Sequence, residues 1–179
     1  MQFVSDWIRI FGQFVGSDHC QLFLQGLQTL PVRMQSIANN TQQLATFLES
    51  RSEVTRVMYP KLPSHPTYDL ANDYLPEALG PGYVWFHVAL KREIEFDKLK
   101  EIFRNIPNLL YETSYGAMKS KLDPWPQLET SDHYEWPRGH VGQKGVWLRI
   151  APGYDDDFDL IQQGVVELLK RLSNYQHVH

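Results

Sequence analysis

The chain has 179 residues, a length that allows one substantial hydrophobic core. Its net charge of −4, without any run of lysines and arginines, excludes the basic surface typical of nucleic-acid-binding proteins. A single cysteine excludes an intrachain disulfide, and no apolar run is long enough to cross a bilayer. We therefore expect a cytoplasmic protein with no nucleic-acid and no membrane partner.

Two short helices are predicted at the start of the chain. Phe3 and Trp7 belong to an apolar set with helical spacing, which predicts a first helix over residues 3–15. Gly16 ends this helix, and a second one runs from residue 17 or 18 to about residue 30. Cys20 lies on the second helix, with no basic neighbour to form a thiolate, and is expected to be a small core residue.

A longer third helix is predicted from Pro31 to about Ser50, because the first turn of a helix tolerates proline. Its expected buried stripe consists of Ile37, Thr41, Leu44, Ala45 and Leu48.

Beyond residue 50, short strands alternate with helices. The predicted strands are Val54–Tyr59, Tyr83–Leu90, Leu109–Thr113 and Val146–Ala151. The predicted helices are Thr67–Tyr74, Ile94–Ile106 and Phe158–Leu172, and the tail Ser173–His179 is expected to fray. Residues 114–145 are rich in proline, glycine, aspartate and histidine, and this composition predicts a long loop. Loops of this length inside a compact domain are usually functional or packed on a partner. This order predicts an α/β (α+β) sandwich: one domain over residues 1–179, with a sheet of about four strands covered by helices on one face.

Arg149 is the most informative single residue. Alternation along Val146–Ala151 places Leu148 on one face of the strand and Arg149 on the other. A guanidinium in an apolar strand is costly unless an anion pairs with it, and its planar fork suits a carboxylate. Two alternatives stay open from the residues alone: an internal salt bridge to an acidic side chain, or binding of a substrate carboxylate.

The segment Glu112–Lys121 leaves a predicted strand and enters the long loop. Ser114 offers a small hydroxyl, Tyr115 an aromatic platform and Gly116 a tight backbone turn. Taken alone, the segment is typical of an ordinary turn. The histidines lack the spacings of zinc sites, so we predict no metal.

Four segments together resemble the Cys/Met-metabolism family of pyridoxal-phosphate enzymes. They are GSDHCQLFLQGLQTLPVRM (Gly16–Met34), YPKLPSHP (Tyr59–Pro66), TSYGAMKS (Thr113–Ser120) and VWLRIAPGYDDDFDLI (Val146–Ile161). They occur in the family's order, and the resemblance runs from about residue 10 to residue 172. It implies the small C-terminal domain of an aspartate-aminotransferase-like enzyme, in which substrate binds between this domain and a large cofactor domain.

The resemblance also implies roles for individual residues. Arg149 falls on the arginine that holds the amino acid's α-carboxylate, and Ser114 on the serine near the cofactor lysine. Tyr115 falls on the following residue, where β-lyases carry tryptophan, and Thr113 stands where γ-lyases and γ-synthases commonly carry glutamate. The resemblance therefore favours a cystathionine β-lyase-like enzyme that cleaves an amino-acid thioether.

Several features depart from the family pattern. Ala117 and Lys119 replace the second glycine and the glutamate of the "GGxES" turn, and Gln25 replaces an arginine. The cofactor lysine and phosphate-binding residues of the family lie in the domain before this one. We therefore expect pyridoxal phosphate in the intact enzyme, none bound to this chain alone, and a homo-oligomer. The alternatives are a cystathionine γ-synthase or O-acylhomoserine sulfhydrylase domain and, from another class, a non-catalytic assembly module.

Overall fold

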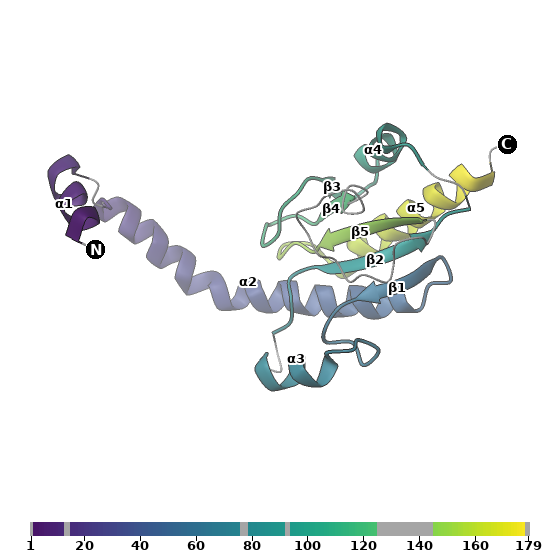
Figure 1. Ribbon diagram of the computed structural model, residues 1–179, viewed down its shortest axis with the longest axis horizontal. Helices are drawn as coiled ribbons and strands as arrows, with labels where there is room; N and C mark the ends of the chain where they lie inside the picture. The colour runs from purple at the N-terminus through teal and green to yellow at the C-terminus, as the bar shows by residue number, and fades with distance from the viewer. Residues whose placement is uncertain (1, 13–14, 76–78, 92–93, 125–144, 178–179) are drawn as a thin grey trace. The chain divides into compact units, whose positions relative to one another are not determined.

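The computed structural model describes residues 2–12, 15–75, 79–91, 94–124 and 145–177 (Figure 1). Contacts group the chain into two compact units, Met1–Arg33 and Met34–His179. The prediction that residues 1–179 form a single domain stays a prediction. Within the described residues, no helix combines the length and the low polarity needed to span a bilayer.

The first unit is helical and exposes much of its apolar surface. Helix α1 (Gln2–Phe11) carries Trp7 stacked on Phe11 with ring centroids 4.4 Å apart, and Gly12 follows it with a φ of 65°. Residues 13 and 14 of the predicted first helix lie outside the described residues. The prediction that Cys20 is a core residue is wrong, because its side chain is exposed.

The predicted break between the second and third helices is also wrong. Helix α2 runs without interruption over Ser17–Glu49, with Pro31 inside it. An interior proline removes one backbone donor and crowds the preceding turn, at a cost of roughly 3 kcal/mol. Near Pro31, Arg33 Nη2 donates to the Gly26 carbonyl at 2.7 Å, and Thr29 Oγ1 donates to the same oxygen at 3.3 Å.

The second unit contains one mixed sheet of five strands in the order β1-β2-β5-β4-β3. The strands are β1 (Val54–Met58), β2 (Val84–Ala89), β3 (Leu110–Tyr111), β4 (Lys121–Pro124) and β5 (Gly145–Ala151). All neighbours pair antiparallel except β3 and β4, which run parallel. The mixed α/β class is confirmed. The sheet has one strand more than the four predicted, because β4 lies in a segment that was predicted to be a loop.

Three further helices belong to this unit: α3 (Tyr68–Tyr74), α4 (Phe96–Arg104) and α5 (Phe158–His177). All three were predicted from the sequence, although α5 continues to residue 177 where a frayed tail was expected. Thr67, the first residue of the predicted helix, lies just before α3, and its side chain makes no capping hydrogen bond. It contacts His65 Nδ1 instead.

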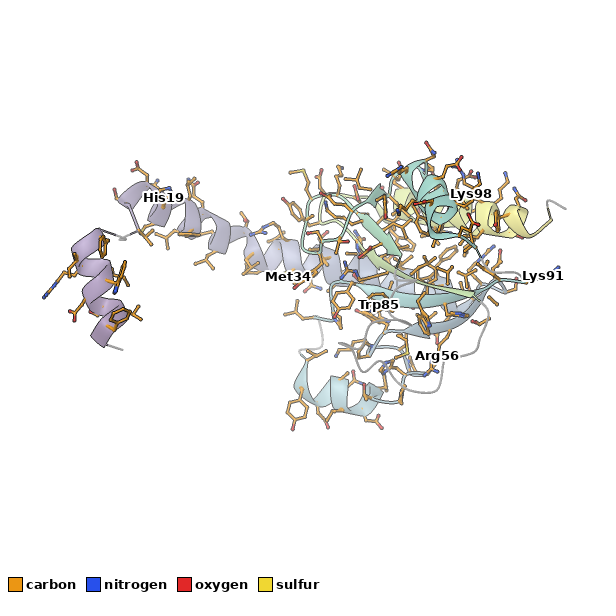
Figure 2. The ribbon with its side chains drawn as sticks, turned by 45° about the horizontal axis from the view of Figure 1, so that its top comes forward. His19, Met34, Arg56, Trp85, Lys91 and Lys98 are labelled. Carbon is orange, nitrogen blue, oxygen red and sulfur yellow. The ribbon has the colours of Figure 1, made fainter. Side chains whose placement is uncertain are left out.

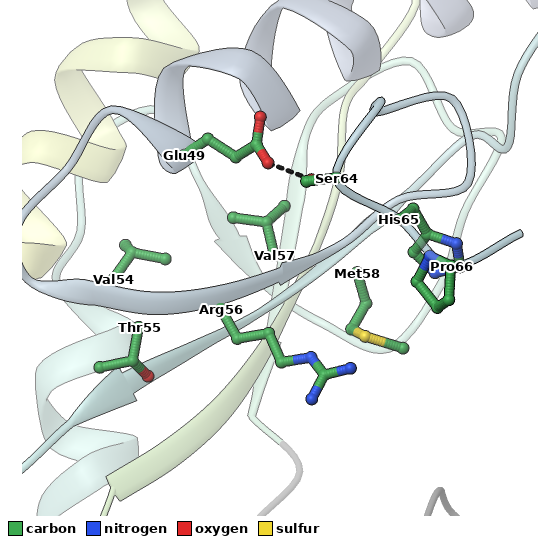
Figure 3. A pocket seen from close by; sticks show the side chains of 9 residues that line it. All are labelled: Glu49, Val54, Thr55, Arg56, Val57, Met58, Ser64, His65 and Pro66. Atoms are coloured by element: carbon green, nitrogen blue, oxygen red, sulfur yellow. Dashed lines mark hydrogen bonds between the residues drawn. The ribbon is translucent and has the colours of Figure 1, made fainter. Parts of the chain in front are cut away.

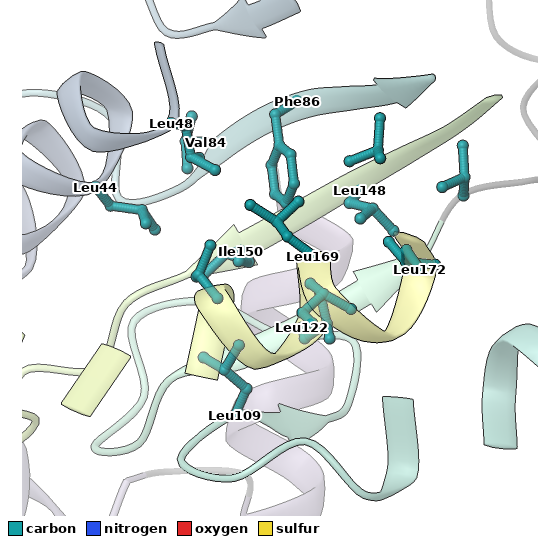
Figure 4. Packing of buried hydrophobic residues seen from close by; sticks show 14 of the residues in the cluster. Leu44, Leu48, Val84, Phe86, Leu109, Leu122, Leu148, Ile150, Leu169 and Leu172 are labelled. Atoms are coloured by element: carbon teal, nitrogen blue, oxygen red, sulfur yellow. The ribbon is translucent and has the colours of Figure 1, made fainter. Parts of the chain in front are cut away.

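One face of the sheet packs on α2, α4 and α5, and this contact forms the hydrophobic core (Figure 4). Figure 1 shows α5 and the second half of α2 running behind the sheet. The predicted stripe of α2 is confirmed, since all five of its residues are buried. The core residues of the three central strands are Val84, Phe86, Val88, Val146, Leu148, Ile150 and Leu122. The opposite face of these strands carries the polar and indole side chains that form the candidate site.

Candidate functional site

A row of four paired residues crosses the sheet on the face opposite the core. Met58 of β1 pairs with Trp85 of β2, Trp85 with Arg149 of β5, and Arg149 with Asp123 of β4. Trp85 is labelled on its strand in Figure 2. Directly paired residues share a face, so strand register alone brings a cation, an anion and an indole together.

Arg149 is held by an ion pair and by two aromatic rings. Its Nη2 donates to Asp123 Oδ2 at 3.0 Å, and both residues are buried, at 8% and 7% exposure. Its Cζ lies 5.9 Å from the ring centroid of Tyr83 and 5.6 Å from that of Trp85. The salt-bridge alternative left open by the sequence is therefore realised in the structure, and two rings add cation–π contacts that orient the guanidinium.

The Asp123 contact leaves binding capacity on Arg149. A guanidinium has five N–H donors in a planar fork. Among the described residues, Asp123 is the only hydrogen-bond partner of the Arg149 side chain. The fork can therefore bind a second carboxylate while Asp123 keeps it in place.

The structure brings one of the three predicted loop residues toward Arg149. Tyr115 contacts Tyr83 with ring centroids 6.0 Å apart, and Tyr83 in turn lies against Arg149. Tyr115 is 67% exposed, which suits a residue at the mouth of a site. Ser114 is half-buried and Thr113 is exposed, and no recorded contact joins either of these described residues to Arg149. Their predicted substrate-binding roles stay predictions.

A polar network fixes the segment that carries Tyr115. Tyr154 N donates to the Ala117 carbonyl at 3.2 Å, and Gly153 N donates to Ser120 Oγ at 2.9 Å. Asn40 of α2 donates from Nδ2 to the Gly153 and Asp156 carbonyls. The turn after β5 therefore joins this segment to both α2 and the strand of Arg149.

Asp156 contributes the charged part of this network. Its Oδ2 accepts a hydrogen bond from Ser120 N at 2.6 Å, and its Oδ1 accepts one from Lys119 Nζ at 3.0 Å. Burial favours a higher pKa for Asp156, but the hydrogen bonds to Ser120 and the Lys119 ion pair outweigh it and lower the pKa. The carboxylate is therefore ionised in the folded protein at neutral pH.

This pKa shift predicts acid sensitivity. A carboxylate whose pKa is lowered by folding stabilises the protein above its unfolded pKa of about 3.9, and the stabilisation is lost as the pH falls through the folded value. We expect the free energy of unfolding to fall below about pH 4, and Asp156→Asn to flatten this part of the pH profile. Urea denaturation of both proteins at several pH values measures it. Equal acid sensitivity in the two proteins would contradict the assignment.

Three contributors to the site were not predicted: Tyr83, Trp85 and Asp123. Asp123 carried a detectable signal, because Lys121, Leu122 and Asp123 alternate polar, apolar and polar as a half-buried strand does. Leu122 is fully buried in the core and Asp123 lies on the opposite face. The two aromatic residues lay within a predicted strand that gave no sign of facing Arg149.

The described lysines do not fit the attachment of pyridoxal phosphate. A lysine that carries this cofactor must lose its proton, which desolvation favours, yet none of the described lysines is buried. Lys119 donates to Asp156 and Asp155, and these contacts raise its pKa. Lys121 pairs with Glu112. Also among the described residues, no group of three histidine, cysteine or acidic side chains lies together as metal ligands would.

Comparisons with solved structures identify the fold. The fold resembles an O-acetylhomoserine sulfhydrylase of Wolinella succinogenes, with a TM-score of 0.68 and 18% identity over 90% of this chain and 41% of that one. It also resembles a cystathionine gamma-lyase of Lactobacillus plantarum complexed with L-serine, with a TM-score of 0.66 and 22% identity over 92% of this chain and 41% of that one. The fold is therefore that of one portion of such enzymes.

Sequence comparison then identifies the family. The model of the Cys/Met metabolism PLP-dependent enzymes matches residues 1–163, and the chain belongs to this family. Cystathionine beta-lyase of Bacillus subtilis is 31% identical over 84% of this chain and 37% of its own length. An L-alanine/L-glutamate racemase of Wolbachia pipientis is 30% identical over 84% of this chain and 36% of its own. The chain spans about a third of the length of these relatives.

Proposed function

We propose that this chain binds the α-carboxylate of an amino-acid substrate in a pyridoxal-phosphate enzyme of cysteine and methionine metabolism. The observation that carries the proposal is the guanidinium of Arg149, held by Asp123 and two rings with donors to spare. Pyridoxal phosphate supplies the electron sink of such enzymes, and the protein supplies binding and orientation. Arg149 would fix the amino acid so that its Cα–H bond faces the base.

The relatives support the carboxylate more directly than the rest of the substrate. They include a racemase, a cystathionine beta-lyase and a cystathionine gamma-lyase of Rattus norvegicus. Their named substrates differ in the side chain and share the amino-acid portion. A carboxylate clamp therefore serves every member, whichever bond the enzyme breaks.

Within this class, we propose that the intact enzyme cleaves a cystathionine-type thioether by β-elimination. Tyr115 keeps an aromatic ring at the position where β-lyases carry tryptophan, and the structure places this ring against Tyr83 beside Arg149. A γ-synthase or a sulfhydrylase is the alternative. The similarity of the fold to an O-acetylhomoserine sulfhydrylase is compatible with this alternative.

Titration with a minimal ligand pair tests the carboxylate proposal. We expect L-methionine, a thioether amino acid, to shift the ¹⁵Nε resonance of Arg149, because a second carboxylate alters the hydrogen bonding of the guanidinium. The matched amine, 3-(methylthio)propylamine, lacks the carboxylate and should leave the resonance unchanged. Arg149→Lys should retain the fold, and the indole resonance of Trp85, which lies against Arg149, should shift with L-methionine in the parent protein and stay unchanged in this variant. Equal shifts with both ligands, or none with L-methionine, would refute the proposal.

The first unit leads to a prediction about association. Large apolar side chains there are exposed, among them Phe3 at 74%, Phe11 at 60% and Phe23 at 65%. Because exposed apolar surface favours association, we propose that the chain forms homo-oligomers through this unit. Light scattering should show a mass that rises with concentration. Phe23→Glu should suppress this rise in mass. The control is Leu70→Glu, which changes an exposed leucine of α3 outside the first unit and should leave the rise in place.

Association without any response to amino acids would favour the assembly-module alternative. A monodisperse monomer at all concentrations would contradict the association prediction and leave the carboxylate proposal standing.

A further inference from the structure

A groove of about 530 Å³ lies along β1 (Figure 3), the strand that β2 separates from β5, which carries Arg149. Every residue of β1 from Val54 to Met58 lines it, together with Glu49 at the end of α2 and the turn at Ser64, His65 and Pro66. The volume is in the range of ligand sites, about 300–1,000 Å³. Because a whole strand forms one wall, the groove has the form of a channel beside a sheet edge.

β1 is the outermost strand on this side of the sheet, and β2 is its only partner strand among the described residues. In an antiparallel pair, every second residue directs its N–H and C=O toward the partner and the others direct them away. The register of β1 on β2 shifts between Val54 and Arg56, so this alternation applies to the regularly paired residues Arg56, Val57 and Met58. Such an edge is a template for an added strand.

The side chains of the groove select for charge at one end. His65 Nδ1 accepts a hydrogen bond from Thr67 N at 3.3 Å, so the neutral ring carries its hydrogen on Nε2. Burial lowers the pKa of His65, and the charge of Arg56 lowers it further. Both side chains line the groove (Figure 3). Glu49, the acidic residue of the groove, accepts a hydrogen bond from Ser64.

A second copy of the same strand suits this edge poorly. Antiparallel pairing of two β1 strands about their middle residue would place the Arg56 side chains of the two copies opposite each other, and like charges directly opposite are destabilising. A strand from another protein with a carboxylate at that position would instead place a negative charge opposite Arg56, which is stabilising.

We propose that this groove binds an extended acidic peptide segment, which adds to the sheet beside β1 and places a carboxylate between Arg56 and His65. Backbone hydrogen bonds to β1 provide affinity, and the carboxylate fixes the register. Arg56 and His65 take no part in the clamp formed by Arg149 and Asp123, so either proposal can fail without the other.

The test uses the full chain and a capped hexapeptide of alternating valine and threonine with one central aspartate. Binding should shift the amide resonances of residues 54–58 and slow their hydrogen exchange. In a control peptide, the backbone nitrogens that would donate to β1 are N-methylated. This peptide should bind at least about tenfold more weakly, because it cannot donate hydrogen bonds to the strand. A peptide with lysine in place of aspartate should also bind more weakly.

A charge exchange provides the matched control. The Arg56→Glu variant should no longer bind the aspartate peptide and should bind the lysine peptide instead. The β1–β2 pairing should be preserved in the variant and in the parent protein. Equal affinity for the N-methylated peptide would overturn strand addition. Equal competition by succinate would reduce the site to one for small anions and would also overturn it. Exchange protection of β1 that appears without peptide at high protein concentration would assign the edge to a second copy instead.

Discussion

Arg149→Ala is expected to lower the free energy of unfolding by about 3–5 kcal/mol, because it leaves Asp123 as an unpaired buried charge. Asp123 is 7% exposed, and its carboxylate accepts a hydrogen bond from Arg149 Nη2. Water cannot replace this donor fully at such a depth. Urea denaturation monitored by tryptophan fluorescence measures the loss.

A double-mutant cycle separates the ion pair from general damage. Asp123→Ala should also destabilise, and the double variant should lose less than the sum of the two single losses, since neither charge is then left alone. Arg149→Lys keeps the positive charge but not the planar fork of the guanidinium. Its loss of stability should therefore be smaller than that of Arg149→Ala, but it should still fail to respond to L-methionine. Additive losses would show that the two side chains do not interact, and would contradict the geometry of the site.

Gly153→Ala is expected to destabilise the protein by about 1–3 kcal/mol, the usual cost of overpacking a tight contact. A methyl group at this position would overlap the carbonyl oxygen of Met118 and would lie 2.7 Å from the Lys119 backbone. Backbone atoms cannot rotate away as a flexible side chain can. The turn after β5 would then move off the segment that carries Tyr115, and the Tyr115 ring resonances should shift together with the loss of stability.

The control for this substitution is Gly26→Ala. Gly26 lies inside α2, and a methyl group there meets no atom within 4 Å. Alanine exceeds glycine in helix propensity by about 1 kcal/mol, so this variant should be as stable as the parent or more stable. Equal stability of the two variants would mean that the contact between Gly153 and Met118 does not constrain the fold.

The sequence predicted most elements of the second unit because their patterns are local. The alternation in Val146–Ala151 correctly placed Leu148 in the core and Arg149 on the other face. The residues opposite Arg149 could not be predicted in the same way. Strand order is a property of contacts between distant segments, and neither Trp85 nor Asp123 lies near Arg149 along the chain.

Two errors have identifiable physical causes. Pro31 predicts a helix start because proline favours a first turn, but a proline inside a helix removes only one backbone donor, and α2 continues through it. β4 was missed because a four-residue strand ending in proline gives a weak signal within a polar loop. Its pairing with β5 then turned the open question about Arg149 into a defined ion pair.

The position of β5 has a consequence for how the chain acquires its structure. β5 lies between β2 and β4, yet it is the last strand to leave the ribosome. Until it arrives, β1 and β2 form only a two-stranded ribbon, which is marginal in water. Contacts of such large sequence separation also slow folding. Nascent chains stopped before residue 145 should therefore remain sensitive to protease, and resistance should appear abruptly when the final strand and α5 are complete.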